Sequence, residues 1–235
     1  VRLDVSQKAF TFVTNGALYD DVLRKDNDSS IFAGYALERA GRILGLANPL
    51  AGKVTAIAGT RRFVRETASN LSLGYLSLIL SGNAYAPSLQ NEVLGALENR
   101  LTIDSRGAFL KGGDRRMVYD YYETPIKDTA LLLRAWVAAK KDHELTDKVL
   151  RWLLKSRAKN GSWGSTNNTI SAVEALTEYT EWKKEGDSNF ELSIALDGAE
   201  KSKTLFSRAN QETTERLVIP VADISKGVMH TVDFV

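Results

Sequence analysis

The sequence predicts a mainly α-helical protein: an α/α toroid of helical hairpins forming an incomplete ring, followed by a partial antiparallel β domain. Up to Gly186 the apolar residues recur at helical spacing. The helices also repeat with a period of about 40 residues. After residue 187 apolar and polar residues alternate, as in strands. We therefore expect a helical domain over residues 1–186 and the start of a β domain over residues 187–235.

The expected helices begin at residues that suit a helix start. Asp28 and Ser29 are cap candidates for the first apolar helix, and Pro87 suits the first position of a later one. The spacing predicts apolar inner helices near 30–44, 69–81, 126–140 and 167–184, and more charged outer helices near 52–66, 87–101 and 146–157. In the inner helices we expect four buried side chains, those of Tyr35, Tyr75, Leu132 and Val173.

The repeat is visible when the helices are aligned. "FAGYALERAG" (32–41) aligns with "SLGYLSLILSG" (72–82), so that Gly34-Tyr35 falls on Gly74-Tyr75. An array of helical hairpins forms either an open solenoid or an α/α toroid. The Gly-Tyr steps favour the toroid, because small residues let inner helices converge. A straight superhelix, or any sheet before residue 186, would remove the basis for the family resemblance given below.

The β pattern begins at Phe190. Pro220 argues for an edge strand or a bend, because proline cannot donate to a sheet ladder. Three strands with an apolar face need partners, so we expect this segment to pack against other structure, as a piece of a longer protein would. The predicted strands are "FELSIALDG" (190–198), which ends in an Asp-Gly turn, "TERLVIPVADI" (214–224) and "VMHTVDFV" (228–235).

Composition excludes several kinds of chemistry. The formal net charge is +2, so no broad basic surface argues for nucleic acid as a partner. The chain has no cysteine, which excludes disulfides, thiolate metal ligands, a cysteine nucleophile and a thioester within these residues. Its two histidines, His143 and His230, offer little for a metal site or a catalytic triad. We assign no catalytic, cofactor-binding or metal-binding residue and expect no cofactor.

The stretch "NGSWGSTNNTISAVEALTEY" (160–179) reads as the start of a helix closed by a tryptophan. Gly161 and Gly164 permit positive φ, and Ser165 or Thr166 can cap the next helix. Trp163 then fills the seam between two helices, without any catalytic role.

The order of residues around this turn resembles the thioester domain of the α2-macroglobulin family. An apolar helix with "WLL" is followed by Asn-Gly, an aromatic residue, "ST", two polar residues, Thr and "A-x-x-A-L". The family typically has Gly-Gly-Phe-Ser-Ser-Thr-Gln-Asp-Thr here; Ser165-Thr166 match, whereas Asn167-Asn168 replace Gln-Asp. The resemblance is sharp over about 125–180, and the β segment resembles the macroglobulin-like domain that follows in bacterial members.

The resemblance implies a fragment of a bacterial protease-trapping inhibitor, which is not an enzyme. Its expected partners are target proteases, bound through the full-length parent, and other macroglobulin-like domains of that parent; this part would not contact a membrane. The expected location is the periplasm or cell envelope, with a lipid anchor on the distant N-terminus in some members. The family's reactive Cys-x-Glu-Gln motif is absent from this sequence, so no reactive residue is carried over.

Two other classes of function stay open on the residues alone. The stretch "DRRMVYDYYETPIKDT" (114–129) holds Asp114, Asp120, Glu123 and Asp128 among three tyrosines. Such acids could serve an α/α-toroid carbohydrate-active or cyclase-type enzyme. They equally suit a hairpin loop in which Asp128 or Thr124 caps the helix behind Pro125. The third possibility is a helical-repeat binding scaffold without chemistry.

Overall fold

The structure, a computed structural model, consists of two compact units, Val1–Tyr179 and Thr180–Val235. The predicted domain boundary between residues 186 and 187 lies outside the residues that the structure describes. These residues are 3–19, 27–82, 87–112, 123–184, 189–207, 209–210, 214, 216–221, 224 and 227–235.

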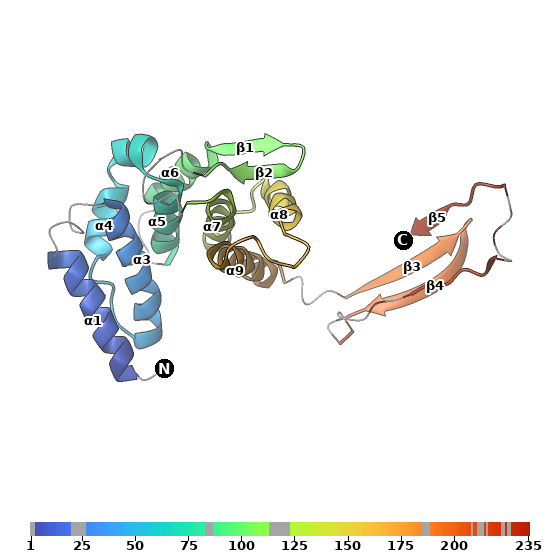
Figure 1. Ribbon diagram of the computed structural model, residues 1–235, viewed down its shortest axis with the longest axis horizontal. Helices are drawn as coiled ribbons and strands as arrows, with labels where there is room; N and C mark the ends of the chain where they lie inside the picture. Colours follow the sequence, from blue (N-terminus) through green and yellow to red (C-terminus); the bar gives the residue numbers. More distant parts are fainter. Residues whose placement is uncertain are drawn as a thin grey trace. The chain divides into compact units, whose positions relative to one another are not determined.

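The first unit is built almost entirely of helices (Figure 1). Its inner helices match the predicted ranges within three residues at each end. These helices are α3 (Asn27–Leu44), α5 (Asn70–Gly82), α7 (Pro125–Ala138) and α9 (Thr166–Lys183). The other helices are α1 (Leu3–Tyr19), α4 (Ala51–Ala58), the π-helix η1 (Phe63–Thr67), α6 (Pro87–Glu98) and α8 (Thr146–Lys155).

Successive inner helices pack against one another, α3 on α5 and α5 on α7 (Figure 1). Each outer helix lies beside an inner one: α4 packs on α3, α6 on α5 and α8 on α7. The side chains between them are fully buried, among them Leu76, Leu94, Leu132 and Trp136. This alternation of inner and outer helices is the architecture of an α/α toroid, as the repeat predicted.

The Gly-Tyr steps bring helices together, but only Gly74 does so between two inner helices, whereas Gly34 lies closest to the outer helix α4. A Cβ atom on Gly74 would lie inside van der Waals contact with Leu131 of α7. A Cβ on Gly34 would come within 2.7 Å of a methyl group of Val54 in α4. At both positions only a glycine lets the two helix backbones approach this closely.

One prediction was wrong: a small sheet interrupts the helical unit. Strands β1 (Leu101–Asp104) and β2 (Gly107–Leu110) form an antiparallel hairpin, and helix α6 ends at Glu98 rather than at 101. The turn forms because Asp104 accepts a hydrogen bond from the backbone N–H of Arg106 at 2.8 Å. Gly107, at φ 147°, lies against the Lys148 carbonyl of α8, where no side chain would fit.

The outer helix predicted over 52–66 is also divided. Helix α4 ends at Ala58 with Gly59 as its cap, and the chain then forms the π-helix η1. The last turn of η1 closes with a hydrogen bond from the Ala68 N–H to the Phe63 carbonyl, at 2.8 Å. Ala68 then turns to an extended conformation, which leads into α5.

Two of the four burial predictions were confirmed and two were wrong. Tyr75 and Leu132 are buried, with 9% and 0% of their surface exposed. Tyr35 is only half-buried, because its hydroxyl reaches charged groups rather than the core. Val173 is 49% exposed, because α9 turns Ala172 and Ala175 to the core.

The second unit is a three-stranded antiparallel sheet in the order β4-β3-β5. Strand β3 (Phe190–Leu196) and the turn at Asp197-Gly198, with φ of 50° and 79°, confirm the first predicted strand. Strand β5 (Val232–Phe234) lies inside the predicted 228–235. The described residues of 214–224 form no strand, so that prediction was wrong. The second strand is instead β4 (Ala199–Phe206), a polar segment paired with β3 through the turn.

Candidate functional site

The tryptophan turn, residues 160–169, uses its polar side chains to hold backbone. Ser165 caps α9 by accepting a hydrogen bond from the Asn168 N–H at 3.2 Å. Thr169 accepts from the Trp163 N–H at 3.1 Å and donates to the Ser165 carbonyl at 2.9 Å. Asn160 accepts from the backbone N–H and the hydroxyl of Ser162. These hydroxyls and amides stabilise the turn itself.

Trp163 closes the seam between α8 and α9, as predicted. Only 7% of its surface is exposed, and its indole N–H donates to the Leu153 carbonyl of α8 at 2.7 Å. The Arg157 guanidinium lies 5.7 Å from the centre of the ring, a cation–π contact. Asn168 joins the turn to α7, because the Thr124 hydroxyl donates to its side-chain oxygen at 2.6 Å.

The acidic stretch 114–129 is described only from Glu123 onward. Asp114, Asp120 and the three tyrosines lie outside the described residues. Thr124 caps α7, accepting a hydrogen bond from the Lys127 N–H with Pro125 in the first turn, as one of the two readings predicted. Asp128 is therefore not the cap: it lies one turn into the helix, with 1% of its surface exposed.

Asp128 of α7 is a buried carboxyl group beside the start of α5. Its Oδ2 accepts a hydrogen bond from Asn70 at 2.9 Å, and Arg100 in turn donates to the Asn70 side-chain oxygen at 3.1 Å. Its Oδ1 has no hydrogen-bond partner within the described part of the chain. Burial raises the pKa of Asp128 to about 7. The Asn70 hydrogen bond lowers this pKa, as do the charges of Lys127 and Arg100, whereas Glu123 raises it further.

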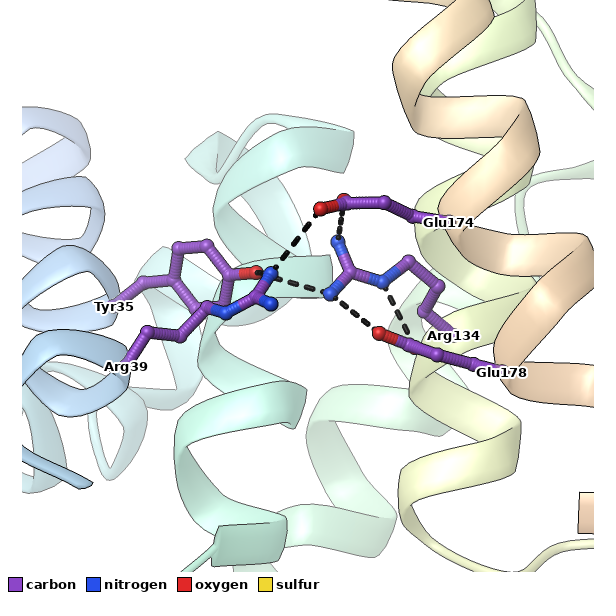
Figure 2. Close-up of polar contacts among 5 residues, drawn as sticks. All are labelled: Tyr35, Arg39, Arg134, Glu174 and Glu178. Atoms are coloured by element: carbon purple, nitrogen blue, oxygen red, sulfur yellow. Dashed lines mark hydrogen bonds and ion pairs between the residues drawn. The ribbon is translucent and has the colours of Figure 1, made fainter. Parts of the chain in front are cut away.

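A cluster of five side chains, the arginine cluster, joins three inner helices (Figure 2). At its centre Arg134 of α7, whose side chain is 8% exposed, makes two parallel hydrogen bonds to Glu178 of α9, at 2.9 and 2.8 Å. It also donates to Glu174 at 2.8 Å and to the Tyr35 hydroxyl of α3 at 3.1 Å. The fifth member, Arg39, donates to Tyr35 at 3.1 Å and to Glu174 at 3.4 Å.

The charges of the arginine cluster balance, with two guanidinium groups facing two carboxylates. Burial alone would lower the pKa of Arg134, but the hydrogen bonds to Glu178 and the charges around it raise this pKa overall. At the neighbouring Tyr75 burial acts in the opposite direction and raises the pKa to about 12. The arrangement holds Arg134 permanently charged and Tyr75 neutral, which suits a structural link between helices.

The sequence contains a signal for the arginine cluster that the predictions from helix spacing do not include. Arg134 interrupts the apolar run "TALLLRAW", where a charge has to be paired when the helix is buried. Glu174 and Glu178, four residues apart, lie on one face of α9. Their meeting could not be read from the sequence, because it depends on how α7 and α9 pack.

Comparison with known proteins identifies the segment that carries most of these features. Residues 111–179, which follow the β1–β2 hairpin, match the family model described as the A-macroglobulin TED domain. These residues form part of an α2-macroglobulin-family thioester domain. Our expectation that a sheet before residue 186 would exclude this family was therefore wrong. The matched segment includes the tryptophan turn, Asp128, and the Arg134, Glu174 and Glu178 members of the arginine cluster.

Two relatives extend the similarity beyond the matched segment. Complement C3 of Lethenteron camtschaticum is 32% identical over 126 residues, which cover 50% of this chain. Thioester-containing protein 1 (allele R1) of Anopheles gambiae is 27% identical over 179 residues, which cover 71% of it. The chain spans only 7% and 12% of the length of these relatives. The expected bacterial origin of the thioester domain stays a prediction.

Proposed function

We propose that the chain is part of a bacterial α2-macroglobulin-like protein that traps proteases in the periplasm or cell envelope. In this proposal residues 1–186 belong to the thioester domain and residues 187–235 begin a macroglobulin-like β domain. The match of residues 111–179 to the thioester-domain model carries the proposal. The tryptophan turn supports it, because it lies inside the match and connects α8, α9 and the start of α7.

We further propose that the chain itself has no covalent or hydrolytic activity. Covalent capture in this family resembles acyl transfer from a strained thioester to a lysine or hydroxyl group of the target. That step needs a cysteine sulfur as the leaving group, and the sequence has none. Target proteases and other domains of the parent protein are therefore partners of the full-length molecule.

Among the residues that the structure describes, no specific observation favours an enzyme. The groove beside α6, described below, has one carboxylate in its lining, that of Glu92, whereas acid–base hydrolysis of a glycoside uses two. Among the described residues no three histidine, aspartate or glutamate side chains gather to hold a metal ion. Within the described ranges, no helix has both the length and the apolar character that a membrane span requires.

Protease trapping is tested on the full-length parent protein. The parent is incubated with trypsin, and the cleavage of a protein substrate is compared with that of a small chromogenic peptide. A trap hinders access of the large substrate, so we expect protein cleavage to fall while peptide cleavage persists. Equal cleavage of the protein substrate with and without the parent would exclude trapping.

Covalent inertness is tested on the 235-residue chain alone. The chain is incubated with labelled methylamine and, in a separate reaction, with trypsin. Both reactions are then analysed under denaturing conditions, so that only covalent products are detected. We expect no label and no covalent conjugate. A stable adduct of this cysteine-free chain would refute the assignment of inactivity, whatever the outcome for the parent.

A further inference from the structure

A groove runs along the outer helix α6, next to the π-helix η1, and it shares one residue, Arg100, with the network around Asp128. Its volume is about 550 Å³, which is within the range of pockets that hold small ligands. The buried residues of α6, Val93, Leu94 and Leu97, belong to the core, so the groove lies on another face of this helix. The residues that line it include Arg65, Asn91, Glu92, Gly95, Asn99 and Arg100.

The basic groups at the groove outnumber the acidic ones. Glu92 is shared between two guanidinium groups, that of Arg65 at 3.1 Å and that of Arg61 at 3.7 Å. Arg100 adds its positive charge to the lining just past the end of α6, where its Nη1 donates to the Ala68 carbonyl at 2.8 Å and to Asn70 at 3.1 Å. The lining therefore holds two guanidinium groups, those of Arg65 and Arg100, and one carboxylate, and this excess of positive charge favours an anionic ligand. Guanidinium groups pair well with carboxylates, through two parallel hydrogen bonds.

Two side-chain amides stand along the same side of α6. Asn91, Gly95 and Asn99 are spaced four residues apart, which puts them in one row on the helix surface. At 1.5 Å per residue the two amides lie about 12 Å apart along the axis. An extended peptide of about four residues spans this length. Each amide both donates and accepts hydrogen bonds, as a peptide backbone requires.

Gly95 leaves the floor of the groove open. It lies inside α6, where a glycine destabilises the helix by about 1 kcal/mol relative to alanine. No neighbour requires it, because a Cβ atom there would meet no described atom within 4 Å. Gly34 and Gly74, in contrast, are needed for helix packing. The glycine at position 95 therefore keeps the space above the helix free for a ligand.

We propose that this groove binds an extended acidic peptide segment of a protein partner. The peptide backbone lies over Gly95, between the amides of Asn91 and Asn99. An aspartate or glutamate side chain of the peptide pairs with Arg65. This proposal concerns a surface of the outer helices and does not depend on protease trapping.

The test selects ligands by means of the groove itself. Random heptapeptides displayed on phage are selected on the 235-residue chain and counter-selected on Gly95→Phe, whose ring fills the groove. We expect the enriched peptides to share aspartate or glutamate residues. Peptides without acidic residues, or no peptides that distinguish the two chains, would refute the proposal.

The selected peptides are then synthesised and their affinity is measured by fluorescence anisotropy. We expect binding to weaken about ten-fold or more on Gly95→Phe, whose ring fills the groove, and on Arg65→Ala, which loses a charge-assisted hydrogen bond. The matched control is Gly52→Phe in α4, where a Cβ also meets nothing within 4 Å, and it should bind normally. Equal weakening by Gly52→Phe would contradict the location.

Two further measurements separate the alternatives. Thermal unfolding of Gly95→Phe should match that of the native chain within a few degrees, so that lost binding cannot reflect lost folding. If Gly95→Phe is unfolded, the proposal is judged on Gly95→Leu and Arg65→Ala. Inorganic phosphate should compete only weakly with the peptide. Full displacement by phosphate at matched ionic strength would instead define a small-anion site and overturn the proposal.

Discussion

The stability of the helical unit should fall as the pH rises from 4 to 7, because of Asp128. The folded state prefers the protonated form of this buried carboxyl, whose pKa is raised from 3.8 to about 7. Below pH 3.8 the group is protonated in both the folded and the unfolded chain, so its contribution to stability is fully present. Between these two values only the folded chain keeps the proton, and the contribution is lost as the pH passes 7.

The size of this effect follows from the pKa. One pKa unit corresponds to roughly 1.4 kcal/mol of free energy. The move from 3.8 to about 7 therefore amounts to about 4 kcal/mol at most. The Asp128 carboxyl has 1% of its surface exposed, so solvent screens its electrostatic interactions little and this free energy needs little reduction.

The assay is urea unfolding of the native chain and of Asp128→Asn at pH values from 4 to 8. The amide keeps an oxygen that can accept the Asn70 hydrogen bond, but it does not titrate. Both chains share His143 and His230, so the difference between their unfolding free energies isolates Asp128. We expect the native chain to lose stability relative to the variant over this range. A flat difference, or one that rises with pH, would refute the assignment of a raised pKa.

Substitutions at three other positions test the packing. Trp163→Ala should lower the free energy of unfolding by about 3–5 kcal/mol in chemical denaturation. The loss for Trp163→Phe should be about 1–3 kcal/mol smaller, because phenylalanine keeps a ring. A near-neutral Trp163→Ala would contradict the role of Trp163 in packing α8 against α9. Arg134→Met should cost about 3 kcal/mol, since Glu178 loses its two hydrogen bonds and Glu174 keeps only Arg39 among the described residues. This is the low end for a broken buried pair, because both carboxylates are partly exposed. A near-neutral Arg134→Met would argue against an electrostatic role. Gly74→Ala should lower the melting temperature, with a cost of about 1–3 kcal/mol from overpacking against Leu131, whereas a more stable variant would show that the helices can move apart.

The inner helices could be predicted because their signals are local. Apolar spacing, the cap at Thr124 and the proline at Pro125 determine where α7 begins, without knowledge of the rest of the fold. The hairpin at 101–110 was missed because it is short and its turn, Ser105-Arg106, lacks glycine or asparagine. Strand β4 was missed because it is polar, and only its pairing with β3 makes it a strand.

The candidate sites depended on contacts that no local pattern contains. The sequence shows Asp128 only as one acid of a loop, whereas its hydrogen-bond partner, Asn70, lies 58 residues earlier. The arginine cluster joins Tyr35 to Arg134 across 99 residues. The tryptophan turn was predicted well, because its glycines, its cap and its aromatic residue all act within ten residues.

The arginine cluster also bears on how the helical unit unfolds. In an array whose hairpins touch only their neighbours, the ends can melt independently and propagate inward. Here Arg39 of α3 donates to Glu174 of α9, 135 residues away. Glu174 also accepts a hydrogen bond from Arg134, and Arg39 is linked to Arg134 through the Tyr35 hydroxyl. If α3 or α9 unfolded locally, the hydrogen bonds between Arg39, Tyr35, Arg134 and Glu174 that hold the other helix would break. The first and last inner helices should therefore unfold in one cooperative step, and hydrogen exchange should give them the same opening free energy.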